Sequence, residues 1–158
     1  RLTSKLPISF NSSKNISLGN GSICPFNSQN TGWLKEAFPL MYLPSFCSFR
    51  MTDIWRSFVA QRIAWTCGWS ILFHGSSVIQ ERNKHDLIKD FVDEVSGYKN
   101  NFNIMNRLIK LKLKPGTKNI KYNMILCYKE LIKMKIIDKK ELKLLKYWFF
   151  DLKLVIKK

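Results

Sequence analysis

The sequence predicts an α/β segment followed by a helical C-terminal region. Two short runs rich in apolar and β-branched residues, 70–73 and 78–80, follow an amphipathic helix and are separated by Gly75-Ser76-Ser77. From Lys84 onward, apolar residues recur at helical spacing instead. A chain of 158 residues is long enough to bury the core of one domain, so a single domain is expected.

Two helices are expected before the strand. Asn30 or Thr31 can cap a first helix over residues 33–38, and Pro39 is expected to kink or end it because proline lacks an amide hydrogen. A second, clearer helix starts with Thr52 as its N-cap and continues to about residue 65. Gly68 is expected to terminate it, and residues 70–73 then form a strand, with residues 78–80 as an extended segment.

Four helices are expected in the C-terminal region. The first two cover residues 86–95 and 103–113, and Pro115-Gly116 ends the second. Thr117 can cap a third helix that runs to residue 134, and Asp138 with Glu141 resembles a capping box that starts the last one. The last two helices are expected to form an antiparallel pair.

The charge distribution bounds the partner classes. The net charge is +16, and residues 81–158 hold twenty Lys and Arg against nine acids, whereas residues 1–80 hold seven against two. Such a field attracts phosphates, anionic lipids or acidic proteins. The lysines are interleaved with Asp and Glu along amphipathic helices, which favours solvated faces over a nucleic-acid partner.

Cysteines and sequons bear on the compartment. Cys24, Cys47, Cys67 and Cys127 form no C-x-x-C pair, so we expect no sulfur-bound metal, while their even number permits disulfides. Three sequons begin at residues 11, 15 and 20 and suit a lumenal protein. The longest nearly apolar run is about half of the roughly 20 residues that span a bilayer. The chain opens on Arg1, and we expect it to be a fragment of a longer protein.

Two charged residues on the helix from Thr52 are candidates for chemistry. Asp53 lies at the helix start, where the dipole stabilises a carboxylate; it is either a simple helix-terminus aspartate or a base at the rim of a pocket. A 100° step per residue places Arg62 in the middle of the apolar face. Its guanidinium therefore serves either packing and ion pairing or a bound anion.

Two polar clusters flank this helix. Before it, residues 26–31 (F-N-S-Q-N-T) carry amides and hydroxyls, which bind sugar hydroxyls and also make turns for local reasons. After it, residues 80–86 (Q-E-R-N-K-H-D) form a second cluster, which is either a solvated loop or a functional one. His74 and His85 have no second ligand at metal spacing.

These two clusters and T-D-I-W-R-S-F-V-A-Q-R at residues 52–62, taken in order, resemble the STELLO-type glycosyltransferase family. The similarity extends from about Cys24 through Tyr98, and the C-terminal region with Tyr147-Trp148 and Asp151-Leu152 is also similar.

The resemblance implies the C-terminal portion of a GT-A-like, Rossmann-related domain followed by a helical tail. It divides the chain into a polar lead at 1–22, which is expected to be poorly ordered, an acceptor-side part at 23–98 and a basic helical region at 99–158. It implies a Golgi membrane protein that faces the lumen through an N-terminal anchor, and a full-length enzyme that uses a nucleotide sugar, a glycan acceptor and Mn²⁺ or Mg²⁺.

The resemblance also assigns roles to residues. Asp53 would be the acceptor-side base, and Gln29, Asn30, Trp55 and Arg56 would line the same pocket. We also expect Asn27, Arg62, Arg82 and Asn83 to bind substrate, from the polar clusters and the apolar face that carry them. No Asp-x-Asp motif occurs in the chain, so we expect no metal ligands here and no sugar transfer by this chain alone. Two alternatives stay open: a noncatalytic scaffold, and a basic helical module that binds nucleic acid or anionic membrane.

Overall fold

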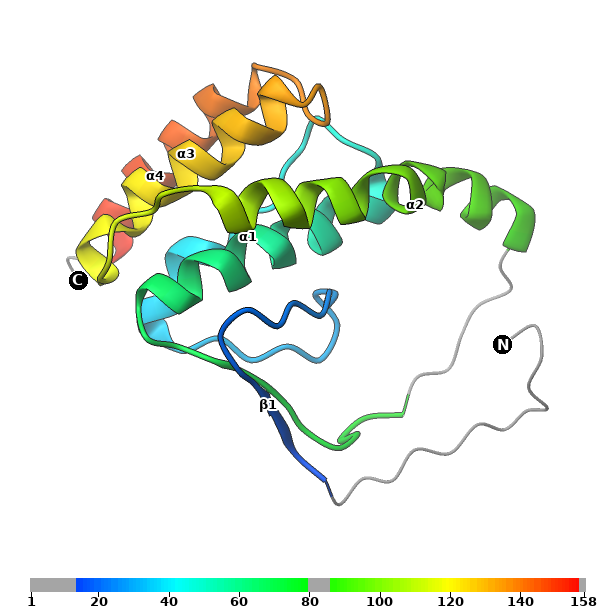
Figure 1. Ribbon diagram of the computed structural model, residues 1–158, viewed down its shortest axis with the longest axis horizontal. Coiled ribbons are helices and arrows are strands. Elements are labelled where there is room, and N and C mark those ends of the chain that lie inside the picture. Colours follow the sequence, from blue (N-terminus) through cyan, green and yellow to red (C-terminus); the bar gives the residue numbers. More distant parts are fainter. Residues whose placement is uncertain (1–13, 80–85, 157–158) are drawn as a thin grey trace.

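The computed structural model describes residues 14–79 and 86–156. Its elements in chain order are β1 (Ile16–Leu18), η1 (Lys35–Met41), η2 (Phe49–Met51), α1 (Thr52–Thr66), β2 (Ile71–Phe73), α2 (Leu87–Lys110), η3 (Thr117–Asn119), α3 (Ile120–Lys133) and α4 (Glu141–Ile156). The three η segments are short 3₁₀ helices. The described part of the chain is mostly helical, with one small sheet (Figure 1).

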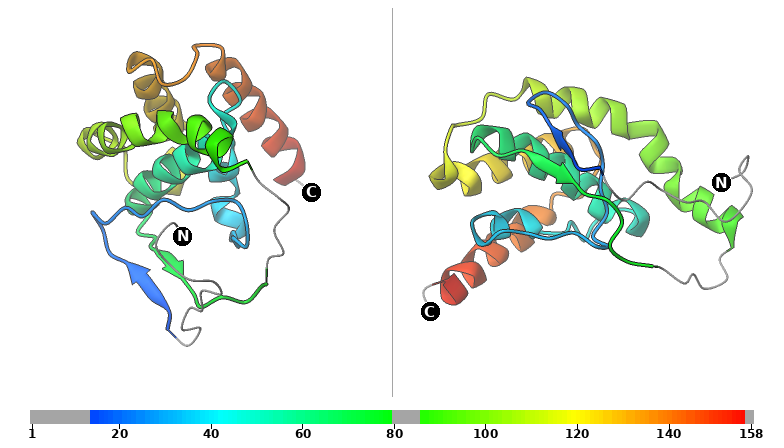
Figure 2. Two further views of the ribbon diagram at one scale, coloured as in Figure 1. Left: turned by 90° about the vertical axis from the view of Figure 1, so that its right-hand side faces the viewer. Right: turned by 90° about the horizontal axis from the view of Figure 1, so that it is seen from below.

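The sheet consists of β1 and β2, which pair antiparallel with Ser17 opposite Leu72. The strand β2 confirms the prediction for residues 70–73, whereas β1 was not predicted from its polar surroundings. Val78 and Ile79 belong to no regular element. Among the described residues there is no parallel strand pair. The two-stranded sheet lies to one side of the helices (Figure 2).

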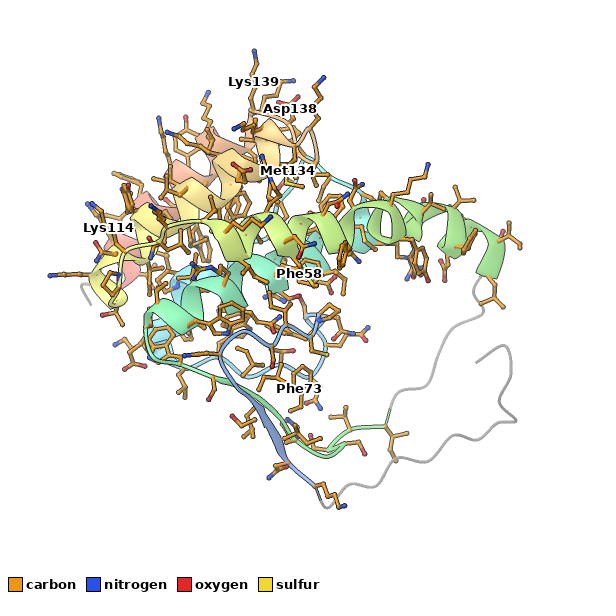
Figure 3. The ribbon with its side chains drawn as sticks, viewed as in Figure 1. Phe58, Phe73, Lys114, Met134, Asp138 and Lys139 are labelled. Atoms are coloured by element: carbon orange, nitrogen blue, oxygen red, sulfur yellow. The ribbon has the colours of Figure 1, made fainter. Side chains whose placement is uncertain are left out.

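Helix α1 is the centre of the body. It packs against α2, α3 and both leading 3₁₀ helices. Its side chains Trp55, Phe58 and Ile63 are at most 2% exposed, and Phe58 points into the space between the helices (Figure 3). Burial of such large apolar side chains is the dominant stabilising contribution, at roughly 1.5–3 kcal/mol each.

Two helices end in the same way. Gly68 (φ 73°) follows α1, with the amide of Trp69 bonded to the carbonyl of Ala64 and that of Gly68 to Trp65. Lys135 (φ 58°) follows α3 with the equivalent pair of bonds. Both are Schellman ends, and glycine fits the first without strain. The predicted stop at Gly68 is therefore confirmed.

Helices α3 and α4 pack against each other as the predicted hairpin (Figure 1). Asp138 and Lys139 lie at its outer turn, where both side chains are exposed (Figure 3). Asp138 accepts a hydrogen bond from the amide of Lys140. The capping-box prediction was wrong for Glu141, because its carboxylate reaches residues 42–46 instead of the helix start.

Two further predictions were wrong. The region predicted as two helices, 86–95 and 103–113, is the single helix α2, which Asp86 caps by accepting bonds from the amides of Ile88 and Lys89. The segment after Asn30 and Thr31 begins helical geometry only at Lys35, and it is 3₁₀ rather than α. Pro39 lies inside it and removes one amide donor.

The four cysteines are free thiols in this structure. Burial raises the pKa of Cys127, which is fully enclosed, to about 12. Among the described residues, no helix is long and apolar enough to cross a membrane.

Candidate functional site

One face of α1 holds the preceding loop, residues 24–28, by its side chains. Asp53 Oδ2 accepts from the amide of Ser28 at 3.0 Å, and Ser57 Oγ accepts from the amide of Phe26 at 3.2 Å. Gln61 binds Cys24 twice, accepting from its amide at 3.1 Å and donating to its carbonyl at 2.8 Å. These three α1 side chains are spaced four residues apart, so they lie along one line of the helix. We call residues 24–28 the strap.

Arg56 braces the strap from the side. Its guanidinium is 3% exposed and lies over the rings of Phe26 and Trp33, at 5.5 and 4.9 Å from their centroids. Its Nη2 donates to Ser28 Oγ at 3.1 Å, while Nε has no hydrogen-bond partner among the described residues. Burial lowers the pKa of Arg56, and the nearby charge of Asp53 opposes that shift.

A cleft of about 660 Å³ opens where the strap meets the start of α1 and one side of α2. The strap side contributes Asn27, Ser28 and Gln29, and the start of α1 contributes Asp53. Asn27 and Gln29 are exposed, and Asn27 Oδ1 accepts from the amide of Gln29 at 3.0 Å. Three of the predicted site residues, Asn27, Gln29 and Asp53, therefore line one cleft.

The opposite wall comes from α2 and η2. It is formed by Phe49, Arg50, Asp90, Glu94, Tyr98 and Asn101, among others. Arg50 and Asp90 form an ion pair. With Asp53 and Glu94, the lining carries three carboxylates against one guanidinium. The cleft is acidic in a chain whose net charge is +16.

The other predicted site residues lie elsewhere. Trp55 is buried below the cleft, where its Nε1 donates to Asn101 Oδ1 at 2.9 Å and so joins α1 to α2. Asn30 (φ 49°) donates from its Nδ2 to Ser77 Oγ at 3.2 Å. Arg56 lies behind the strap. None of the three is part of the cleft lining.

Arg62 stabilises the end of α2. Its Nε donates to the carbonyl of Leu108 at 3.0 Å, and Nη2 donates to that of Leu111 at 2.7 Å. Leu108 lies in the last turn of α2, and Leu111 directly follows the helix. Each carbonyl also accepts one backbone amide, from Leu111 and Leu113 respectively, so Arg62 supplies a second donor to the helix end. This is a packing role, with the guanidinium also 5.8 Å from the ring of Trp65. Arg82 and Asn83 lie outside the described residues.

The described residues do not fit a divalent metal site. They contain no group of three or more His, Cys, Asp or Glu side chains placed to hold an ion. Within the cleft, the Asp90 carboxylate already pairs with Arg50.

The sequence reasoning missed the α2 wall of the cleft. Asp90, Glu94, Gly97 and Asn101 follow spacings of four, three and four residues, which places them on one helical face. That pattern would have identified them if residues 87–110 had been read as one helix. Gly97 faces η2, where an added Cβ would collide with the sulfur of Met51.

Glu141 was also missed as a structural centre. Its side chain is fully buried and accepts hydrogen bonds from the hydroxyl of Tyr42 and from the amides of Ser45 and Phe46, at 3.1 and 2.9 Å. Burial and the Glu141 carboxylate raise the pKa of Tyr42 well above its ordinary value. This arrangement fixes the connection between η1 and η2, which leads into the cleft.

Comparison with known proteins places the chain in a family. No curated protein matches it. The family model for STELLO glycosyltransferases matches residues 50–157, a range that begins within η2 and includes all of α1, α2, α3 and α4. The match covers more than half of the 158 residues and includes Asp53 and the α2 wall, while the strap lies before it. The chain therefore belongs to the STELLO glycosyltransferase family.

Proposed function

We propose that the cleft between the strap, α1 and α2 binds the sugar acceptor of a glycosyl transfer, and that Asp53 is its general base. The observation that carries the proposal is the meeting of Asp53, Asn27 and Gln29 in one cleft of about 660 Å³. Side-chain amides and carboxylates suit sugar hydroxyls because they offer donors and acceptors side by side. The exposed rings of Phe49 and Tyr98 add apolar surface for a sugar face.

The chemistry assigned to Asp53 is proton acceptance. An acceptor hydroxyl hydrogen-bonded to its carboxylate loses its proton as the oxygen attacks the anomeric carbon of the donor. The new carbon–oxygen bond forms while the bond to the leaving phosphate breaks, and the nucleotide departs with the electron pair. Among the described residues, only Oδ2 of Asp53 is hydrogen-bonded, which leaves Oδ1 for the acceptor.

Further features belong to the same proposal. The donor is a nucleotide sugar, the parent domain is GT-A-like, and the protein resides in the Golgi lumen behind a membrane anchor. The exposed sequon residues Asn15 and Asn20 are consistent with a lumenal location. Mn²⁺ or Mg²⁺ is implied by the family resemblance. The described residues do not provide a set of ligands for it.

The decisive variant is Asp53→Asn. The amide oxygen of asparagine can still accept from the Ser28 amide, so the strap should keep its position, whereas a neutral amide accepts no proton. Sugar transfer by the full-length protein should fall by about 10²-fold or more, with acceptor binding to this chain changed less than about threefold. Transfer is measured with labelled nucleotide sugar, and acceptor binding by saturation-transfer NMR.

Asp151→Asn is the matched control, since Asp151 is an exposed aspartate on α4. It should change neither readout. If Asp53→Asn transfers sugar at the native rate, Asp53 is a strap residue only and the proposed base is wrong. If acceptor glycans receive no saturation transfer from this chain, the acceptor site itself is wrong.

A further inference from the structure

Helix α2 carries a regular row of apolar side chains. From Ile88 the spacings alternate strictly between three and four residues up to Ile109. The row consists of Ile88, Phe91, Val95, Tyr98, Phe102, Met105 and Ile109. We call these seven residues the seam. An alternation of three and four is the repeat by which one helix packs along another in a coiled coil.

The seam is open to solvent. Ile88, Phe91, Tyr98 and Phe102 are 75, 58, 71 and 70% exposed, and Ile109 is 43% exposed. Val95 and Met105 are half-buried, and Met105 also packs against the hydrophobic core. The helix buries a different side against the body, formed by Gly97, Ile104 and Leu108. The rings of Phe91 and Tyr98 lie 6.0 Å apart, so the seam is continuous along the helix surface.

The shape of the molecule leaves room for a partner here. The N-terminal end of α2 extends beyond the other helices in both Figure 1 and Figure 2. An exposed apolar row of this length on a surface helix marks an interaction site.

We propose that the seam pairs with the seam of a second copy of this chain, as a parallel two-stranded coiled coil. Alternate seam positions, Ile88, Val95, Phe102 and Ile109, correspond to the a sites of the repeat. Three of these four are β-branched, which favours two strands over three or four.

The flanking charges select the parallel orientation. In a parallel, in-register pair, Glu94 lies beside the partner's Lys99, and Lys99 beside the partner's Glu94, which gives two opposite-charge contacts. An antiparallel pair places Glu94 near the partner's Asn101 and Lys99 near the partner's Val92, with no ion pair. Lys99 is exposed and Glu94 is half-exposed, so both can reach a partner.

The pairing has a consequence for the cleft. Glu94 and Tyr98 belong to the seam or its flank and also line the cleft. The second copy therefore brings a lysine to the rim of an acidic site. The dimer proposal does not depend on the cleft binding a sugar, because its readouts are mass and cross-linking.

Sedimentation equilibrium of this chain tests the proposal. The native chain should dimerise, and Phe102→Glu should raise the dissociation constant at least about tenfold, because a charge enters the apolar row. Phe150→Glu is the matched control: the residue type is the same and Phe150 is 62% exposed, but it lies on α4. It should leave the dissociation constant within about twofold. A native chain that stays monomeric at about 100 μM overturns the proposal.

Two surface changes test orientation without placing a charge in the row. Glu94→Lys and Lys99→Glu should each weaken the dimer, and the double variant should restore it. Ile88→Cys should form a disulfide between the two copies of residue 88, which are adjacent only in a parallel pair. Failure of the double variant to restore dimerisation, or absence of that cross-link in a dimeric sample, rules out the parallel pair.

Discussion

Glu141 shows how one residue can fix a distant connection. Its fully buried carboxylate accepts hydrogen bonds from the backbone amides of residues 45 and 46 and from the hydroxyl of Tyr42. A hydrogen bond to a charged acceptor is worth about 1.5–3 kcal/mol, and an unsatisfied buried donor costs a similar amount. The connection between η1 and η2 therefore depends on a side chain about a hundred residues later.

We predict that Glu141→Gln destabilises the chain by about 3 kcal/mol. Glutamine offers one acceptor oxygen and turns an NH₂ group toward backbone donors, so at least one donor is left unsatisfied. Urea unfolding followed by circular dichroism measures the loss. Glu36→Gln, an exposed glutamate in η1, is the control and should change the free energy of unfolding by less than about 0.5 kcal/mol. Equal effects of the two changes would contradict this account.

Residue patterns located charged groups but did not assign their partners. The prediction that Arg62 lies on the apolar face of α1 left two interpretations open, packing or anion binding, and its hydrogen bonds to the carbonyls of Leu108 and Leu111 favour packing. Those carbonyls are 46 and 49 residues away along the chain. No local pattern points to such a partner, because the contact exists only once α2 has packed on α1.

At the scale of elements, α1 has two buried faces instead of one. The apolar face was predicted from its periodicity. A second face, with Ser57 and Gln61, is also fully buried, because the strap covers it. A buried amide is tolerated only when its hydrogen bonds are made, and here the strap backbone makes them.

We predict that Gln61→Ala releases one end of the strap. The change removes both hydrogen bonds to Cys24 and costs about 2 kcal/mol. Hydrogen exchange of the Cys24 and Phe26 amides should accelerate while the amides of α3 stay protected. Gln29→Ala, at an exposed strap-side glutamine, should leave exchange at Cys24 unchanged. Acceleration throughout the chain would indicate global unfolding instead.

Two helices were predicted in place of α2. Ser, Gly and Asn at 96, 97, 100, 101 and 103, which have low helix propensity, lie at or beside the predicted break. Tertiary packing overrides that preference. Gly97 lets α2 lie against η2, and Asn101 accepts the hydrogen bond of Trp55. The side-chain amide of Asn100 donates a hydrogen bond to the carbonyl of Ser96, in the same helix, at 2.8 Å. Helix propensity is a weak signal wherever a residue has a specific tertiary role.

For the whole molecule, one core joins the segments before and after residue 98. The core cluster includes Leu40 from η1, Phe58 from α1, Ile104 from α2, Met124 from α3 and Leu145 from α4. The sequence predicted α1, α3 and α4 from their apolar stripes, whereas it divided α2 into two helices. It overestimated the sheet, because short apolar runs do not distinguish a paired ribbon from a larger sheet.

We predict that the chain unfolds in a single cooperative transition. Tryptophan fluorescence, which includes Trp55 in α1 and Trp148 in α4, and far-ultraviolet circular dichroism should give one urea midpoint. Leu145→Ala, at a fully buried site, should lower both midpoints together by an amount equivalent to about 2–5 kcal/mol. Separate midpoints for the two probes would show that the helical hairpin is an independent unit.

The positive charge is distributed over this body. Lys114, Lys121, Lys140 and Lys143 each lie within 6 Å of an aromatic ring centroid, on Tyr122, Phe149, Phe46 and Tyr147 respectively. Such contacts hold lysines against the fold's own aromatic side chains.

The strap and α1 run side by side, and their backbones advance by different distances per residue. Two residues of extended chain advance about 6.6 Å, whereas four residues of helix advance about 6 Å. Each successive hydrogen-bonded pair is therefore offset by about half an ångström more than the one before it. Because there are only three such pairs, at Asp53, Ser57 and Gln61, the side chains can absorb the total offset. Removing one residue from the strap shifts the chain by half of this two-residue repeat, and the amides that now bond to α1 then point away from the helix. The hydrogen bond between Asp53 and the Ser28 amide sets where Asn27 and Gln29 lie. The distance from the Asp53 carboxylate to these side-chain amides therefore depends on the number of strap residues rather than on the shape of the cleft.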